Sequence, residues 1–395
     1  MVILMSKKGI PLIGILILGL AFLAQSVFDI IGFGADNIRL INTENGISFA
    51  LDSNPSFHSN GNRNFHFVTR TGVRHVNDRG ETRWQESFLL TQPQMAARGD
   101  IIAVGEANMG RVIYVYNSEG LMYTQHIDNP VRGFSVNSAG DLSVITQFDG
   151  GFEVLVYNQL RHNDHVFGMQ VVQAVRPMQI PVIAEVSEDG RFVAIAYLDY
   201  SRHLSAAIEF WPIGHTPWGT DGLFAQTDFP DELFITMRFM ADNHVLIITR
   251  SRIILYQIEG NVLQRIWTEY MSNEIDQLAF CGNDSFAFAS GTALRPDGRY
   301  ADPVGTVNIF NLSGPTGSYN LGRRVTYLSM DNNTVIAGAE RYFHAVNSRG
   351  TSLWHHNVLH DVRDMIFLHD TDTVLIAGAN RADVWRRQRV RNGGN

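Results

Sequence analysis

The chain has 395 residues, 45% of them hydrophobic and 18% charged, with a formal net charge of −8. This composition supplies enough apolar side chains for a large core and differs from that of a disordered chain. The negative charge excludes a general attraction to nucleic acid, because such binding needs a basic face. The single cysteine, Cys281, excludes an intramolecular disulfide and any metal site built from several cysteines. Apolar neighbours predict that it is a buried small side chain.

Residues 10–28, IPLIGILILGLAFLAQSVF, carry no charge. As a helix they would span roughly 28 Å, about the hydrocarbon thickness of a bilayer. Lys7 and Lys8 precede the segment and Asp29 follows it. Because positively charged residues stay on the cytoplasmic side, we expect residues 1–9 in the cytoplasm and the body of the chain outside. The segment is therefore predicted to be a single-pass anchor in the cytoplasmic membrane.

A cleaved signal sequence is the alternative for the same segment. Ala24, Gln25 and Ser26 offer small residues at a spacing that suits cleavage after Ser26. Cleavage would leave a secreted or periplasmic protein. Both interpretations predict that the body of the chain is exported.

Past residue 36 the sequence alternates short apolar runs with clusters of Gly, Asn, Asp and Ser, a pattern typical of strands and turns. One kind of polar turn recurs at a spacing of roughly 45 residues, which is the period of propeller blades. The turns are HSNGN at 58–62, ARGD at 97–100, NSAGD at 137–141, SEDGR at 187–191, ADNH at 241–244, GND at 282–284, DNNT at 331–334 and HDTDT at 369–373.

A second phrase recurs within these units. HVNDRGETRW at 75–84 and AVNSRGTSLW at 345–354 share Val, Asn, Arg, Gly and Trp in register, and VYNSEGLMYT at 115–124 keeps the Asn-x-x-Gly. In a unit of four antiparallel strands, the first kind of turn would join strands one and two. The second phrase would then form the corner between strands three and four. The second strands carry the least charge, which predicts that they lie near the crowded axis of the ring.

Eight turns predict one all-β propeller of eight four-stranded blades over residues 37–386, with seven blades as the alternative. The last unit ends after ADVW at 382–385 and lacks a fourth strand. NIRLIN at 37–42 is strand-like and precedes the first unit, so we expect it to complete the last blade and remove the open edges. Residues 387–395 are predicted to be a flexible basic tail.

The Asn-x-x-Gly-x-x-x-Trp phrase resembles the repeat of the quinoprotein-like (PQQ-type) propellers. In that family the glycine lies in the turn and the tryptophan packs between blades. The resemblance implies turn roles for Gly80, Gly120 and Gly350, and packing roles for Trp84 and Trp354.

The resemblance has departures. Trp267 follows Gly260 by more residues than the motif allows, and WD40-like propellers are nearly as good a comparison although no Trp-Asp signature is present. Members of the quinoprotein-like family include membrane dehydrogenases, and also non-enzymatic scaffolds such as the envelope lipoprotein of outer-membrane protein assembly. The resemblance thus implies a propeller fold and leaves both kinds of function open.

Candidates for chemistry are few. His355, His356, His360 and Asp364 are metal-ligand types, but their expected positions on strands and a loop would make the side chains diverge. Acidic turns such as SEDG at 187–190 are shorter than a Ca²⁺ loop and predict turns in which a side chain bonds the nearby backbone. We therefore expect no metal site and no cofactor. Paired carboxylates for glycoside hydrolysis could be assembled from many loops.

Two long insertions are the candidates for recognition. WPIGHTPWGTDGLFAQTDFPDELF at 211–234 carries Trp218, Phe224 and Phe229, and GTALRPDGRYADPVG at 291–305 carries Arg299 and Tyr300. A long loop packed on its own blade is the alternative for the first. Because aromatic and arginine side chains dominate interface hot spots, these five are predicted to contact a partner, on a common face.

The sequence favours a membrane-anchored, monomeric binding scaffold that recognises a protein or an envelope polymer outside the cytoplasm. The anchor, the insertions and the lack of catalytic motifs support it. The alternative is a propeller enzyme, either a quinone-type dehydrogenase or a hydrolase.

Overall fold

The computed structural model describes residues 38–51, 55–59, 61–106, 108–158, 168–174, 179–199, 205–213, 223–230, 232–260, 262–292, 305–369 and 372–389. Apart from one short 3₁₀ helix, η3 (Ala241–Asn243), the regular elements in these ranges are strands. None of the described segments forms a helix of the length and hydropathy needed to cross a membrane. The predicted anchor at 10–28 lies outside the described residues.

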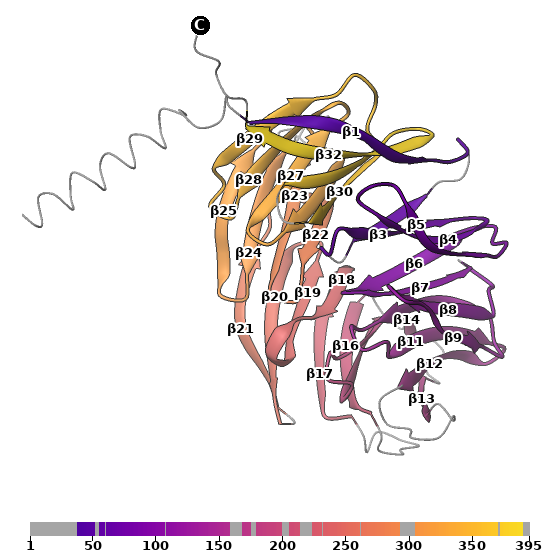
Figure 1. Cartoon of the computed structure of the whole chain (residues 1–395). Coiled ribbons are helices and arrows are strands. Elements are labelled where there is room, and N and C mark those ends of the chain that lie inside the picture. The colour runs from indigo at the N-terminus through magenta and orange to yellow at the C-terminus, as the bar shows by residue number, and fades with distance from the viewer. Residues whose placement is uncertain are drawn as a thin grey trace, which may run out of the picture.

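The strands form eight four-stranded sheets, the blades of a propeller, which confirms the predicted fold class (Figure 1). The first four blades follow the chain: blade 1 has β2 (Ser56–Ser59), β3 (Asn64–Thr69), β4 (Gly72–Asn77) and β5 (Thr82–Ser87); blade 2 has β6 (Pro93–Arg98), β7 (Ile101–Glu106), β8 (Val112–Asn117) and β9 (Gly120–His126); blade 3 has β10 (Val131–Val136), β11 (Leu142–Phe148), β12 (Gly151–Asn158) and β13 (Gly168–Ala174); blade 4 has β14 (Gln179–Val186), β15 (Phe192–Asp199), β16 (Ser205–Pro212) and β17 (Ala225–Pro230).

The remaining blades repeat the plan: blade 5 has β18 (Phe234–Phe239), β19 (His244–Thr249), β20 (Arg252–Glu259) and β21 (Val262–Tyr270); blade 6 has β22 (Glu274–Cys281), β23 (Ser285–Thr292), β24 (Thr306–Asn311) and β25 (Gly314–Asn320); blade 7 has β26 (Tyr327–Asp331), β27 (Thr334–Ala339), β28 (Tyr342–Asn347) and β29 (Ser352–Asn357); blade 8 has β30 (Asp364–His369), β31 (Thr373–Ala377), β32 (Arg381–Arg389) and β1 (Ile38–Ser48).

Blade 8 closes the ring with strands from both ends of the described chain. β1 pairs antiparallel with β32, with Asn42 opposite Trp385 and Ile47 opposite Ala382, and Figure 1 shows the indigo and yellow strands side by side. The predicted pairing of 37–42 with the last strand is confirmed. β32 also extends to Arg389, so the first residues of the predicted tail belong to the sheet. Pairing with β1 satisfies main-chain groups that would otherwise form an open edge.

The second strands of the blades are largely buried. In β27 all six residues are buried, and in β31 all five. The reason differs from the predicted one. The first strands of neighbouring blades contact each other and line the central channel, whereas each second strand lies between two strands of its own sheet and between two neighbouring blades. Apolar side chains on both faces of the strand therefore pack between blades.

Strand direction divides the connections between two faces of the disc. Neighbouring strands within a blade are antiparallel. The first-to-second and third-to-fourth turns therefore lie together on one face, which we call face I. The second-to-third turns and the blade-to-blade connections lie on the other, which we call face II. β1, as the fourth strand of blade 8, begins on face I at Ile38 and ends on face II at Ser48.

The repeated Asn-x-x-Gly phrase forms the corner between the third and fourth strands, as predicted. The Asn347 side-chain oxygen accepts the main-chain N–H groups of Arg349 and Thr351 at 3.0 and 2.9 Å, and Asn77 accepts the equivalent pair. Gly350 lies at φ +79°. A Cβ there would come within 2.0 Å of the Ser318 carbonyl oxygen on blade 6, so the turn also packs closely against the neighbouring blade.

Trp84 and Trp354 hold equivalent positions, opposite His75 and Ala345, each two residues before the turn asparagine. Trp354 is 1% exposed and belongs to a core cluster shared by blades 7 and 8. Trp84 is half-buried, and its ring stacks on Tyr116 of blade 2 at a centroid distance of 5.5 Å. Both rings therefore lie between neighbouring blades.

Candidate functional site

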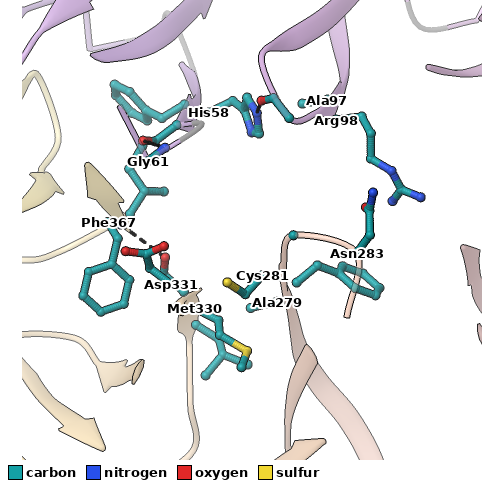
Figure 2. Close-up of a pocket in the computed structure, with 18 of the residues that line it drawn as sticks. His58, Gly61, Ala97, Arg98, Ala279, Cys281, Asn283, Met330, Asp331 and Phe367 are labelled. Atoms are coloured by element: carbon teal, nitrogen blue, oxygen red, sulfur yellow. Dashed lines mark hydrogen bonds between the residues drawn. The ribbon is translucent and has the colours of Figure 1, made fainter. Parts of the chain in front are cut away.

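A cavity of about 360 Å³ opens at the centre of face I. Seven blades, all except blade 4, contribute first strands or first-to-second turns to its walls, and Figure 2 shows side chains around an open space. Polar and ionisable groups among them are His58, Ser59, Arg98, Ser138, Arg238, Cys281, Asn283, Ser329 and Asp331. The repeated polar turns of the sequence thus converge on one site because the ring places every first-to-second turn around the same axis.

The rim of the cavity is rigid because hydrogen bonds form within its turns and between turns of neighbouring blades. The Asn137 side-chain oxygen accepts the N–H groups of Ala139 and Asp141, at 3.0 and 2.8 Å. The Asn137 amide nitrogen donates to the Ser187 carbonyl oxygen in the next blade at 2.9 Å. The Ser187 hydroxyl in turn accepts the N–H groups of its own turn. These contacts confirm that SEDG is a side-chain-bonded turn.

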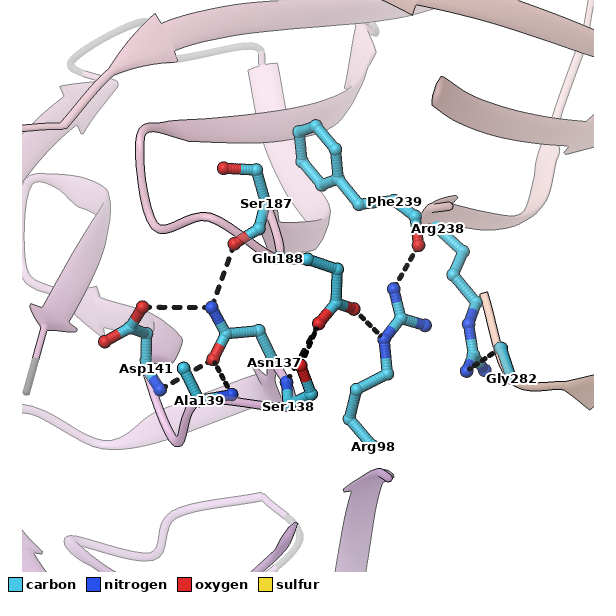
Figure 3. Close-up of polar contacts among 10 residues, drawn as sticks. All are labelled: Arg98, Asn137, Ser138, Ala139, Asp141, Ser187, Glu188, Arg238, Phe239 and Gly282. Carbon is cyan, nitrogen blue, oxygen red and sulfur yellow. Dashed lines mark hydrogen bonds and ion pairs between the residues drawn. The ribbon is translucent and has the colours of Figure 1, made fainter. Parts of the chain in front are cut away.

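Arg98 joins four blades across the channel (Figure 3). Its guanidinium, with only 4% of the side chain exposed, donates to the Glu188 carboxylate of blade 4 and to the Phe239 carbonyl oxygen of blade 5. The other carboxylate oxygen of Glu188 accepts the Ser138 main-chain N–H of blade 3 at 3.1 Å. Charge-assisted hydrogen bonds of this kind are stronger than neutral ones. The hydrogen bonds and the ion pair of Arg98 therefore link blades across the channel and help to hold the inner strands in place.

Arg238 is the second arginine of the cavity wall, and it uses little of its hydrogen-bonding capacity. Its guanidinium lies 4.1 Å from the centroid of the Phe280 ring and makes one long bond, 3.4 Å, to the Gly282 carbonyl oxygen. The buried Nε has no hydrogen-bond partner among the described residues. The aromatic face holds the guanidinium in place, and its terminal N–H groups, which make only the one long bond, suit recognition of an incoming acceptor.

Two titratable groups in the cavity wall, Cys281 and His58, have pKa values shifted by burial. Burial, and then the nearby Asp331 carboxylate, raise the pKa of the Cys281 thiol to about 11, and its Sγ accepts the Asn332 N–H at 2.8 Å. The thiol is therefore protonated at neutral pH and is a poor nucleophile. Burial also lowers the pKa of His58, whose ring is bonded to the Gly99 carbonyl oxygen.

Glu185 lies near this network on the inner strand of blade 4. Burial raises the pKa of its carboxyl group to about 7, with Arg98 opposing the shift and Glu188 adding to it. Among the described residues, no group of three or more His, Cys, Asp or Glu side chains is placed to hold a metal ion.

The predicted recognition residues fall in different environments. Trp218, Arg299 and Tyr300 lie outside the described residues. Phe224 is half-buried, with its ring 5.1 Å from that of Phe192. The expectation for Phe229 needs correction: it is 1% exposed, because it belongs to strand β17 and turns inward opposite Ala206. Its side chain is part of the core of blades 4 and 5 and is not available to a partner.

The two insertions do not open on a common face, contrary to the prediction. The first lies between β16 and β17, the third and fourth strands of blade 4, so its ends are on face I. The second lies between β23 and β24, the second and third strands of blade 6, so its ends are on face II. Only the first insertion shares a face with the central cavity.

The polar residues of the cavity were missed by sequence reasoning. Arg98, Glu188 and Arg238 come from three blades, and no local motif connects them. The position of these residues within the repeat could have identified them. Each of these charged residues lies in or beside a first-to-second turn, and those turns surround the axis of a propeller.

The fold and its central mouth define an eight-bladed propeller of the WD40-like class. The crystal structure of the C-terminal WD40 domain of Sif2 is similar, with 11% identity and a TM-score of 0.55, over 87% of this chain and 98% of that one. BamB from Moraxella catarrhalis aligns with 12% identity and a TM-score of 0.49, over 88% of this chain and 100% of that one. At these identities the likeness concerns the fold alone.

The model of the family described as "Family of unknown function (DUF5711)" matches residues 45–386. The chain belongs to this family. A comparison with curated proteins gave no match.

Proposed function

We propose that this protein is an extracytoplasmic binding scaffold, held at the outer face of the cytoplasmic membrane by residues 10–28, that docks a protein or envelope polymer on face I. The central cavity carries this proposal. Its walls are turns and main-chain groups from seven blades, unlike the mostly apolar lining of a small-molecule pocket. Arg238 offers a positioned cation within it. A broad rim with one positioned charge suits contact with a large partner.

The first insertion extends this surface. Because its ends open on face I, we propose that Trp218 contributes to the same contact, as an aromatic anchor beside the polar mouth. Phe224 holds the C-terminal end of the insertion against blade 4, since its N–H donates to the Phe210 carbonyl oxygen at 3.2 Å. Arg299 and Tyr300 belong to the insertion that opens on the opposite face, and they are excluded from this contact.

The membrane segment would attach at the rim of the same face. β1 begins on face I, and residues 29–37 span at most about 30 Å when extended. A partner on face I is therefore close to the membrane, such as the exposed part of another envelope protein. The basic charge of Arg238 favours a partner that presents a carboxylate or another acceptor.

Crosslinked pull-down from cells tests the proposal. The full chain with a C-terminal tag would be compared with Arg238→Gln, Trp218→Ala and Tyr300→Ala, and with Arg79→Gln as an exposed control in a third-to-fourth turn. We expect one partner to be captured by the wild type, Tyr300→Ala and Arg79→Gln, and to be lost or reduced about tenfold with Arg238→Gln and Trp218→Ala. Equal capture by all five proteins would contradict the proposed surface.

A further inference from the structure

A second cavity, of about 310 Å³, opens on face II, between the outer strand of blade 8 and blade 1. It is separate from the central channel. Its walls come from the end of β1, from the turn between β3 and β4, and from the connection that follows β5. The side chains that decide its chemistry are Phe49, Phe67, Arg70, Arg74 and Leu89.

Main-chain hydrogen bonds fix all three walls. The N–H of Leu90 donates to the Arg70 carbonyl oxygen at 2.8 Å, and the N–H of Phe88 donates to the Thr71 carbonyl oxygen at 3.3 Å. On the other side, the N–H of Phe49 donates to the Asn380 carbonyl oxygen at 2.9 Å. The cavity is therefore formed before any ligand arrives, which lowers the entropic cost of binding.

Its floor is apolar and aromatic. Phe67 is 2% exposed and lies 5.6 Å, centroid to centroid, from the half-buried Phe49. Leu89 stands at the rim with 83% of its surface exposed. An apolar side chain this exposed gains free energy when a ligand covers it, at about 25 cal/mol per Å² of apolar surface removed from water.

The charged side chains of the cavity are all cationic, and its other polar side chains are the hydroxyls of Ser48, Thr69 and Thr71. Arg70 and Arg74 are exposed, and the lining contains no aspartate or glutamate. The Arg74 guanidinium carbon lies 6.0 Å from the Phe67 ring centroid, at the border between the apolar floor and solvent. Across the described part of the chain, no carboxylate forms an ion pair with either guanidinium. Two unpaired guanidiniums beside an aromatic floor complement a ligand with a carboxylate next to a large apolar group.

We propose that this cavity binds the C-terminal carboxylate of a polypeptide that ends in a large apolar residue. Phe49, Phe67 and Leu89 contact the terminal side chain, and Arg70 and Arg74 receive the carboxylate. The volume suits one such residue. β1 crosses the disc from face I to face II, so the cavity opens on the face away from the first residue of β1, Ile38, and, in the proposed function, away from the membrane. A soluble peptide therefore reaches it more readily than a lipid of the anchoring membrane.

The probes for a test are N-acetyl-4-fluorophenylalanine and its neutral carboxamide. Binding to the full chain in lipid nanodiscs would be followed by ¹⁹F NMR line broadening. We expect saturable binding of the carboxylate and about tenfold weaker binding of the amide, because the neutral amide loses charge-assisted hydrogen bonds to the guanidinium groups. The double variant Arg70→Gln/Arg74→Gln should lose the preference for the carboxylate. The matched control, Arg79→Gln/Arg349→Gln on face I, should keep it.

Equal broadening by the acid and the amide of the wild type would overturn the assignment without any variant. So would a preference that survives the Arg70→Gln/Arg74→Gln double variant. Tighter binding of phenyl phosphate than of the carboxylate would replace the peptide terminus with a phosphorylated ligand and also overturn it. These outcomes are independent of capture on face I.

Discussion

Trp84 donates a hydrogen bond of 2.9 Å from its indole Nε1 to the carbonyl oxygen of Ser118, the first residue of the third-to-fourth turn in the next blade. Trp267 repeats the contact, donating to the carbonyl oxygen of Leu312 at 2.9 Å. Ser118 and Leu312 each follow the asparagine that ends a third strand. In both cases a tryptophan on the outer strand of one blade thus forms a hydrogen bond with the third-to-fourth turn of the next blade. Trp267 does so although its distance from Gly260 departs from the repeat motif, because this hairpin is longer: pairing continues beyond Leu255 and Trp267 as far as Glu259 and Val262.

Trp354 occupies the equivalent site in blade 7, but its buried Nε1 has no hydrogen-bond partner in the described structure. The cause is the ring closure. The third and fourth strands of blade 8 come from opposite ends of the described chain, so no turn joins them to supply the carbonyl oxygen. Trp354 instead packs in an apolar cluster that includes Leu40 of β1.

Trp354→Ala should therefore destabilise the fold by about 3–5 kcal/mol, because it empties a large buried site at the closing interface. Trp84→Ala should cost less, because Trp84 is half-buried. Thermal and urea unfolding of the two variants would measure the difference. An unchanged melting temperature for Trp354→Ala would count against packing between blades 7 and 8 as a source of stability.

Gly350→Ala should cost about 2–4 kcal/mol, because the new Cβ would meet the Ser318 carbonyl oxygen in a backbone already in the left-handed region. Gly260→Ala is a matched control. Gly260 has φ +61°, but a Cβ added there would meet nothing within 4 Å, so its replacement should cost about 1 kcal/mol. Equal losses of unfolding free energy in the two variants would show that the close approach between blades 6 and 7 is unimportant.

Glu188→Ala should destabilise the protein by about 3–5 kcal/mol, because it leaves the buried guanidinium of Arg98 without its counter-ion. The double variant Arg98→Met/Glu188→Leu removes both charges and should recover most of the loss. Urea unfolding of Arg98→Met, Glu188→Leu and the double variant forms the required cycle. Purely additive losses would contradict the coupling of blades 2 and 4 through this pair.

Glu185 predicts a pH dependence. Its folded-state pKa, raised to about 7 by burial, lies above that of an unfolded glutamate, so folding favours the protonated carboxyl group. Its contribution to stability is present at acidic pH and is lost as the pH rises through about 7. Glu185→Gln should flatten this part of the stability profile and raise the melting temperature at pH 8. A profile identical to the wild type between pH 5 and 8 would contradict the assignment.

The eight blades and the ring closure could be predicted from the sequence because the turns are encoded locally. Asn77, Asn117 and Asn347 each bond main-chain N–H groups within four residues, so the same short phrase produces similar corners in blades 1, 2 and 7. Counting strands also predicted the ring closure: the last unit lacked a fourth strand, and residues 37–42 were a strand without a unit of their own. Such features need no knowledge of distant contacts.

The candidate site could not be predicted in the same way. Arg98 and Glu188 are 90 residues apart, and their pairing depends on the radius of the ring and the direction of each inner strand. The face of each insertion depends on whether it follows a second or a third strand, which the sequence left open. Phe229 was assigned to a loop although it continues a sheet as part of β17.

Site-specific photo-crosslinking of the full chain in its membrane tests the central claim most directly. A photoreactive residue at Asn283, on the rim of the face I cavity, would be compared with one at Val262, which is 64% exposed on the outer strand β21. The binding-scaffold account predicts a discrete adduct of one partner from position 283 that is absent from position 262 and disappears with Arg238→Gln. No adduct from position 283, or equal adducts from both positions, would contradict it.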